Sequence, residues 1–366
     1  MKKDIERVLR EAPGLKGRQI AKKLGLEKKD VNSFLAHQEH NFAKDENDCW
    51  SIVQPLELSV QFNPHSWIDA DSFEDCLIET GSPLESECTQ VVFVIPEKCR
   101  LLVEASCRLL ALCNQLVDVG KKVTLDFTGY KQALSFLDRV GFFSVLSEKC
   151  EVLPKKPKVS RAQRYKGQNK KLVEFGVIEP TECKGKELTS EDKSMIDELT
   201  DAFVDQAGNE YETVASTIFG ELIGNIKNHS STKLKGLASL HKYEGSRPHI
   251  QTVVSDSGTG IAGTLKKGLE QHYPELYKKN NQDDYEAFLV QEAMTKGGIS
   301  RHGKGRGAGF QSTSKQVIKF DAKLVVRQET FSLKIEYKNG DLVSVVPRMN
   351  LPRILGTHIC FDFMLD

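Results

Sequence analysis

Three short stretches near the N-terminus repeat apolar residues at helical spacing. They cover residues 4–11, 17–24 and 27–37, and Gly25-Leu26 separates the second from the third. A polar loop then leads to a short apolar run at 49–53, in which Trp50 can close a small core. This pattern predicts a helix-turn-helix followed by a β-wing within residues 1–54.

The pattern changes twice in the middle of the chain. Residues 55–90 are broken by prolines and glycines and predict a connecting segment. Residues 91–153 read as a β-α-β-α unit, with strands at 91–95 and 123–127 and helices at 100–119 and 130–140. Residues 154–171 then concentrate lysine and arginine, which predicts either a solvated linker or a segment that contacts phosphates.

The C-terminal half opens with a predicted strand at 172–178 and a predicted helix at 191–206. With the segments before it, this half makes the chain an α+β protein. Residues 172–366 form its largest predicted domain, preceded by segments 1–54, 55–90, 91–153 and 154–171.

Composition adds limits to this picture. The 366 residues carry 51 Lys+Arg and 51 Asp+Glu, so any basic surface must be local. No stretch approaches the roughly 20 apolar residues that cross a bilayer, and the first residues lack a secretory signal, so we expect a cytoplasmic protein without membrane contact. The nine cysteines show no metal-binding spacing and are expected to be reduced thiols, several of them buried.

The first polar motif lies on a helix predicted over residues 211–230. Apolar residues mark one face of this helix, whereas Glu221, Asn225 and Asn228 mark another. Glu221 and Asn225 are four residues apart and can therefore serve one site. A side-chain amide oxygen suits Mg²⁺ bound to substrate phosphates, and a carboxylate one turn earlier can activate water against a γ-phosphate. We therefore expect Asn225 to bind magnesium and Glu221 to be the catalytic base.

The second motif, Asp256-Ser-Gly258-Thr-Gly260, follows a strand predicted over residues 250–255. Glycine leaves the turn free of side-chain bulk. A carboxylate at this strand end can accept a hydrogen bond from the exocyclic amine of adenine, which selects ATP over GTP. Asp256 is therefore the candidate adenine-binding residue.

The third motif alternates glycine with other residues and contains Gly303, Gly305, Gly307 and Gly309. Backbone N–H groups in such a segment can approach phosphate oxygens, and a helix predicted over 311–320 would face them with its N-terminus. The spacing matches neither a P-loop nor a Rossmann fingerprint. In this order the three motifs predict a pocket for ATP and Mg²⁺.

The ordered trio resembles the N, G1 and G2 boxes of the GHKL superfamily, to which DNA gyrase B, the ninety-kilodalton heat-shock chaperones, MutL and histidine kinases belong. The resemblance covers residues 172–366 and implies a Bergerat fold, in which strands 323–328, 331–337 and 358–363 complete an antiparallel sheet with helices on one face. It also implies an ATP lid over residues 261–302 and places Thr357 near adenine.

The two upstream segments have resemblances of their own. Residues 91–153 resemble a STAS domain, which implies a protein partner. Residues 1–54 resemble a winged helix, a fold that binds DNA or RNA in some proteins and docks proteins in others. For nucleic acid the contacts would come from Lys28, Lys29 and Asn32, at the start of the third helix. A homodimer is a further expectation.

Three activities are open for such a chain. We expect foremost a slow Mg-dependent ATPase, in which lid closure moves the DNA- or protein-binding module. The first alternative is an anti-sigma-like serine/threonine kinase that acts on a STAS-type partner. The second is a transcriptional regulator that senses the nucleotide without hydrolysing it. A sensor histidine kinase is disfavoured, because no heptad-patterned histidine segment precedes residue 172.

Overall fold

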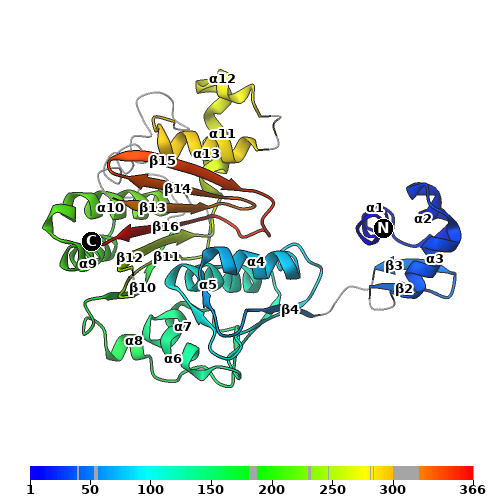
Figure 1. The fold of residues 1–366 in the computed structure, drawn as a ribbon, viewed down its shortest axis with the longest axis horizontal. Coiled ribbons are helices and arrows are strands. Elements are labelled where there is room, and N and C mark those ends of the chain that lie inside the picture. The colour runs from blue at the N-terminus through cyan, green and yellow to red at the C-terminus, as the bar shows by residue number, and fades with distance from the viewer. Residues whose placement is uncertain are drawn as a thin grey trace. The chain divides into compact units, whose positions relative to one another are not determined.

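The computed structural model describes residues 1–38, 41–52, 57–180, 188–229, 232–245, 247–280, 282, 284–299 and 321–365. Its contacts divide the chain into two units (Figure 1). The first unit comprises residues 1–58 and 87–90, and the second comprises residues 59–86 and 91–366.

The described part of the first unit contains three helices and a small antiparallel sheet. The helices are α1 (Lys2–Glu11), α2 (Gly17–Leu24) and α3 (Lys28–Ala36), and the strands are β1 (Leu15–Lys16), β2 (Phe42–Lys44) and β3 (Cys49–Ile52). The strand order is β1-β3-β2. Apolar residues that set the helical spacing, such as Ile5, Ile20 and Leu35, are fully buried near Trp50. The predicted helices and wing strand are confirmed.

The middle of the chain contains a parallel sheet with helices. Strands β4 (Glu57–Gln61), β6 (Gln90–Val94), β8 (Lys122–Asp126) and β9 (Glu151–Leu153) follow one another in the sheet. The other elements are β5 (Trp67–Ile68), α4 (Ala70–Thr80), β7 (Arg100–Leu101), α5 (Val103–Asp118), α6 (Lys131–Arg139), α7 (Phe142–Val145) and α8 (Arg161–Arg164). The predicted β-α-β-α order is confirmed.

The segment that we expected to be a connector, residues 55–90, contains β4, β5 and α4. Pro64 lies in the turn between β4 and β5, and Pro83 lies after α4. The two strands are short and prolines lie on both sides of α4, which is why the sequence pattern missed these elements.

The basic segment contacts acidic residues of helix α9 (Ser190–Ala207). Lys166 lies 3.3 Å from Glu198, and Lys170 lies 2.8 Å from Asp205. Both lysines are exposed, so each pair contributes little stability. These pairs attach the segment to α9 and reduce the positive charge that it presents to solvent.

The C-terminal part forms a seven-stranded antiparallel sheet, in the order β10-β11-β12-β16-β13-β14-β15. The strands are β10 (Leu172–Ile178), β11 (Gly236–Tyr243), β12 (His249–Asp256), β13 (Ala322–Arg327), β14 (Ser332–Lys338), β15 (Asp341–Arg348) and β16 (Thr357–Met364). Five of these strands were predicted to within two residues at either end. Strands β11 and β15 were not predicted.

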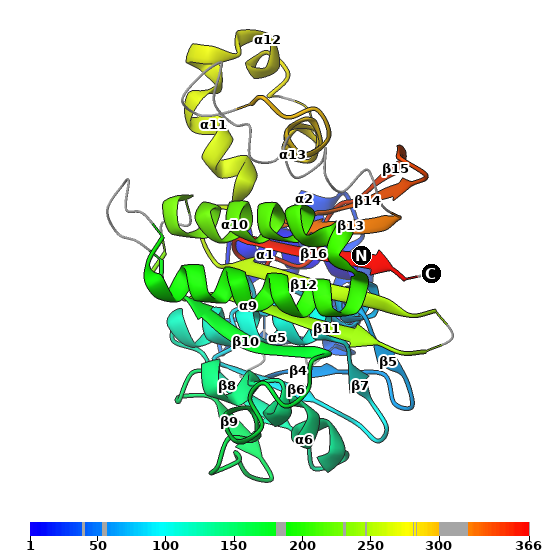
Figure 2. The ribbon, with the colours of Figure 1, turned by 90° about the vertical axis from the view of Figure 1, so that its left-hand side faces the viewer.

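Helices α9 and α10 (Glu212–His229) cover one face of this sheet (Figure 2). Helices α11 (Gly260–His272), α12 (Pro274–Tyr277) and α13 (Tyr285–Thr295), with the turn η1 (Asn209–Tyr211), complete the described helical structure of this part. The predictions for α9 and α10 are confirmed, whereas the predicted helix at 311–320 lies outside the described residues. Within the described ranges no helix combines the length and apolar content that a membrane span requires.

The opposite face of the sheet is covered by α5, which belongs to the middle region and not to residues 172–366, whose helices were expected on one face. Helix α5 contacts β11 and β12 on one side and β8 on another. Its residues are buried except Asn114, Val117 and Asp118. A helix buried almost all round needs a layer on each side. The middle region therefore forms the second cover of the C-terminal sheet.

A buried ionic cluster joins this cover to the sheet. The guanidinium of Arg327, on β13, donates to both carboxylate oxygens of Glu74 on α4, at 2.9 and 3.1 Å. Arg108 on α5 donates to Glu74 at 2.8 Å and to Glu104 at 3.2 Å. All four side chains are at most 9% exposed. Each ion needs its partners, because an unpaired charge at this depth is strongly unfavourable.

We predict that Glu74→Gln lowers the free energy of unfolding by about 3–5 kcal/mol, because it leaves Arg327 buried without a carboxylate. Urea titration of the full chain measures this loss. Asp75→Asn is the matched control, since Asp75 lies on the same helix in an exposed pair with Arg348. It should change stability by less than about 1 kcal/mol. Equal losses in the two variants would contradict the role of the cluster.

Candidate functional site

The turn after β12 and the turn before β16 meet at one edge of the C-terminal sheet. Asp256 and Thr357 are partners in the antiparallel register of these strands. The Gly258 N–H donates to Asp256 Oδ1 at 2.7 Å, and Thr357 also donates to this carboxylate. The fold thus brings Thr357, which the resemblance had placed near adenine, next to Asp256 and Gly258 of the second motif.

Two glycines allow this close approach. Gly356 has φ +91°, and a Cβ atom there would lie 2.1 Å from the carbonyl oxygen of Asp256. Gly260 has φ +71°, and its Cβ would lie 2.7 Å from Oε1 of Gln328. Side chains rarely adopt this backbone region, and here they would also collide. The sequence analysis had singled out Gly260 but not Gly356.

Gln328 connects the two turns to α11. Its Nε2 donates to Thr357 Oγ1 at 3.1 Å, and its Oε1 accepts from the N–H of Ile261 at 2.8 Å. Ile261 lies in the first turn of α11, so Gln328 fixes the start of this helix against β16. Sequence reasoning missed Gln328, because a single glutamine after a strand carries no motif.

Burial shifts the titration of the carboxylate at this site. It raises the pKa of Asp256 from 3.8 to about 6, although hydrogen bonds from Gly258 and Thr357 oppose the rise. The carboxylate is therefore ionised at neutral pH. Because the residue is only half-buried, the ionised group can accept a hydrogen bond from a ligand.

Helix α10 carries a polar stripe formed by Glu221 and Asn225. Both are half-buried, and among the described residues neither side chain has a hydrogen-bond or ion-pair partner. Burial raises the pKa of Glu221. Asn228, one turn further, is exposed. Lys227 points inward and pairs with Asp192 of α9 at 3.0 Å.

The stripe and the Asp256 turn lie on the same side of the sheet. Helix α10 contacts β12, and Val254 of this strand belongs to the apolar cluster that α10 fills. Successive side chains of a strand point to opposite faces, so Asp256 shares the face of Val254. The register of β16 places Thr357 on this face as well, with Ile359. The structure therefore combines the first two motifs on one face.

The third motif cannot be placed in this way. Gly303, Gly305, Gly307 and Gly309 lie outside the described residues. Of the expected lid, the structure describes helices α11 to α13 and the residues around them up to 299.

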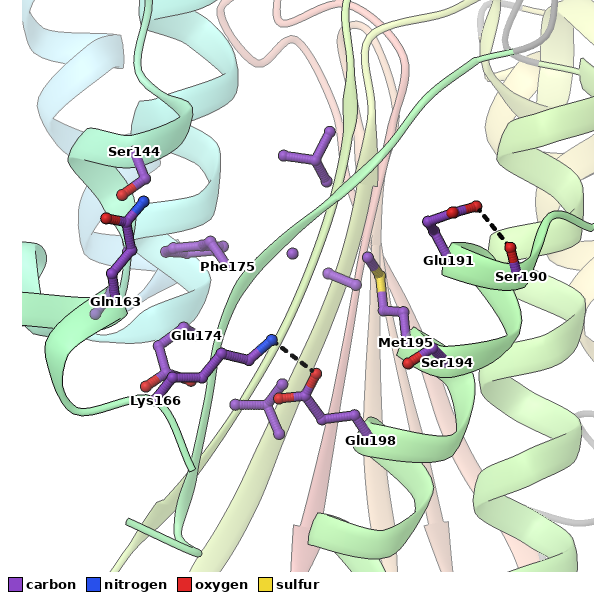
Figure 3. A pocket seen from close by; sticks show the side chains of 16 residues that line it. Ser144, Gln163, Lys166, Glu174, Phe175, Ser190, Glu191, Ser194, Met195 and Glu198 are labelled. Carbon is purple, nitrogen blue, oxygen red and sulfur yellow. Dashed lines mark hydrogen bonds and ion pairs between the residues drawn. The ribbon is translucent and has the colours of Figure 1, made fainter. Parts of the chain in front are cut away.

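A separate cavity of about 590 Å³ lies between α9, β10 and the short helices α7 and α8 (Figure 3). Its carboxylates already have partners within the chain: Glu174 pairs with Arg139, Glu191 accepts from Ser190, and Glu198 pairs with Lys166. None of the residues of the first two motifs, which the structure describes, lines it. This cavity therefore does not belong to the candidate site.

In the first unit, Lys28 and Lys29 are exposed at the start of α3. Asn32 is half-buried, and a Cβ atom on Gly17 would lie 1.8 Å from its Oδ1. Asn32 thus packs against the start of α2, whereas the two lysines remain accessible.

The chain matches no protein-family model, and the search of curated proteins finds no match. Its function must therefore be inferred from its motifs and from the geometry around them.

We predict that Asp256 makes stability depend on pH. The folded state binds its proton up to about pH 6, whereas the unfolded chain releases it near 3.8. Stability contributed by the protonated group is therefore lost as the pH rises from about 4 to about 6. Between pH 4 and pH 7, the wild type should lose on the order of 2 kcal/mol relative to Asp256→Asn, as measured by urea unfolding. A difference between the two proteins that stays constant with pH would refute this assignment.

Proposed function

We propose that the chain binds Mg-ATP through a Bergerat-type domain of the GHKL class and hydrolyses it slowly. The observation that carries this proposal is that Asp256 and Thr357 lie on the face of the sheet that α10 covers, with the stripe of Glu221 and Asn225, whose side chains have no partner among the described residues. An acidic strand end next to a polar helix face is the combination that the sequence motifs predict for an adenine nucleotide.

Each residue has a specific role in this proposal. The carboxylate of Asp256 accepts the hydrogen bond of the adenine amine, and its bond from Thr357 fixes its orientation. Asn225 supplies a neutral oxygen ligand to Mg²⁺, an ion that in such sites keeps water molecules and substrate phosphates as its other ligands. Bound Mg²⁺ neutralises charge on the phosphates. Glu221 orients the attacking water and accepts its proton.

The half-buried position of Glu221 supports this role. Burial raises the pKa of its carboxyl, which makes the ionised group a stronger base. Without a partner among the described residues, the carboxylate does not have to break an ion pair before it acts. The glycines at 303–309 would contribute phosphate contacts, as their sequence motif suggests.

We predict that Glu221→Gln lowers the rate of ATP hydrolysis by about 100-fold or more, while ATP affinity changes by less than about threefold. Incubation with γ-labelled ATP and Mg²⁺, followed for free phosphate and for labelled protein, measures the rate. Glu212→Gln is the matched control, because Glu212 is exposed at the start of the same helix. It should retain the wild-type rate.

The same experiment separates the alternative functions. Label transferred to a protein in place of free phosphate would indicate a serine/threonine kinase, for which a STAS-like partner is the expected substrate. Binding without any wild-type turnover would indicate a nucleotide sensor. Calorimetry that detects no association of Mg-ATP with the wild-type chain would refute the proposal altogether.

A nucleic-acid-binding role for the first unit is favoured by its topology. The order α1-β1-α2-α3-β2-β3, with a sheet ordered β1-β3-β2, agrees with the order expected of a winged helix-turn-helix. Exposed Lys28 and Lys29 lie at the N-terminal end of α3, the end from which such helices reach DNA.

We predict that the double substitution Lys28→Ala, Lys29→Ala weakens DNA or RNA binding because it removes phosphate contacts. The slope of log affinity against log salt concentration should fall by roughly 2, as measured by fluorescence anisotropy with duplex probes. The double substitution Lys22→Ala, Lys23→Ala on α2 removes the same charge and should reduce the salt-dependence slope by less than the double substitution on α3 does. Wild-type binding that does not respond to salt would exclude these contacts.

A further inference from the structure

We infer that Gln115 of α5 is a positioning residue for the nucleotide site, although it belongs to the middle region and lies on the other side of the sheet. This inference rests on the proposed function. Gln115 would act through the two turns that carry Asp256 and Thr357, without contact with the ligand.

Gln115 is fully buried and uses its amide on both turns. Its Nε2 donates to Ser257 Oγ at 2.8 Å and to the carbonyl oxygen of Leu355 at 3.0 Å. Its Oε1 accepts from the N–H of Leu355 at 2.9 Å. An amide offers two donor hydrogens and one acceptor oxygen, and all of them are engaged.

The partners of Gln115 lie next to the two residues proposed to contact adenine. Ser257 directly follows Asp256, and Leu355 lies two residues before Thr357. One side chain therefore fixes the distance between the two turns. That distance has little tolerance, because Gly356 already approaches the backbone of Asp256 too closely for a Cβ atom.

Gln115 and Gln328 hold the same turns from two directions. Gln328 binds Thr357 and the start of α11, and Gln115 binds the backbone at Leu355 and the hydroxyl of Ser257. If Gln115 is lost, the Ser257 hydroxyl and the Leu355 N–H lose this partner, whereas the Leu355 carbonyl oxygen keeps His358 Nε2 at 3.1 Å. The side chain that joins the two turns is then absent, and the turns can separate. Asp256 and Thr357 then no longer present one fixed arrangement to adenine.

A neighbouring residue provides the matched control. Asn114 also makes two hydrogen bonds from α5, donating to Val145 O at 3.3 Å and accepting from Ser147 N at 2.8 Å. Both partners lie in the middle region, away from the two turns. Asn114→Leu therefore removes a comparable set of bonds without affecting the site.

We predict that Gln115→Met, which keeps the volume and removes the amide, weakens Mg-ATP affinity at least tenfold. Isothermal titration of the full chain measures the affinity. Asn114→Leu should stay within about twofold of the wild type. Hydrogen exchange of the ligand-free proteins gives a readout that does not depend on ATP: the Leu355 amide should exchange faster in Gln115→Met and unchanged in Asn114→Leu.

The outcomes separate this inference from the proposed function. A wild type that does not bind Mg-ATP overturns both. A wild type that binds, together with Gln115→Met of equal affinity or an equal loss in Asn114→Leu, overturns the role of Gln115 alone. Should Gln115→Met fail to fold, Ser257→Ala removes one of the three bonds and should weaken binding severalfold. Unchanged affinity in Ser257→Ala would then overturn the inference.

Discussion

The burial of α5 between two sheets is the constraint on which the rest of the structure depends. The side of this helix that faces the C-terminal sheet is polar and includes Glu104, Arg108 and Gln115. Burying such side chains is strongly unfavourable unless hydrogen bonds or ion pairs replace their contacts with water. The partners come from distant parts of the chain: Arg327 through Glu74, and the backbone of Leu355. Apolar contacts alone would allow α5 to slide along the sheet, because they have no direction. The hydrogen bonds and ion pairs allow one placement.

The position of the proposed site depends on the neighbouring strands β12 and β16, which α5 helps to cover. Side chains of β12 and β16 alternate between two faces, so Val254 and Ile359 pack beneath α10 while Ser255 and His358 face α5. Their buried hydrogen bond, from Ser255 Oγ to His358 Nδ1 at 2.6 Å, shows how polar the α5 face is, and burial lowers the pKa of His358 to about 3. At the ends of these strands, Asp256 and Thr357 belong to the α10 face, whereas Gln115 reaches the adjoining backbone from the α5 side. A change in how α5 packs would therefore alter the proposed nucleotide site, and by linkage a ligand bound at that site would stabilise the packing of α5.

Much of this could be predicted from the sequence, because helices with long periodic faces and strands of apolar residues carry a local signal. The polar stripe of α10 and the turn after β12 were identifiable for the same reason. Strand β11 contains Gly236, Ala238 and Ser239, residues with little preference for strands. Strand β15 is a largely exposed edge strand and lacks a buried apolar face. The sequence pattern therefore predicted neither strand. The partnership of Gln115 and Gln328 with the site could not be foreseen. It depends on residues that are distant in the chain and adjacent only after folding.

The pairing of Glu74 with Arg327 also limits which upstream segments can be recombined with the C-terminal sheet. The two residues are 253 positions apart, yet Glu74 is the carboxylate with which the buried Arg327 pairs, whereas Glu74 also pairs with Arg108. A recombination event that joined the C-terminal sheet to an upstream region without a carboxylate at the position of Glu74 would leave the guanidinium of Arg327 buried without that partner. Such an exchange therefore requires that the new upstream region supply a carboxylate at this position, or that Arg327 be replaced at the same time.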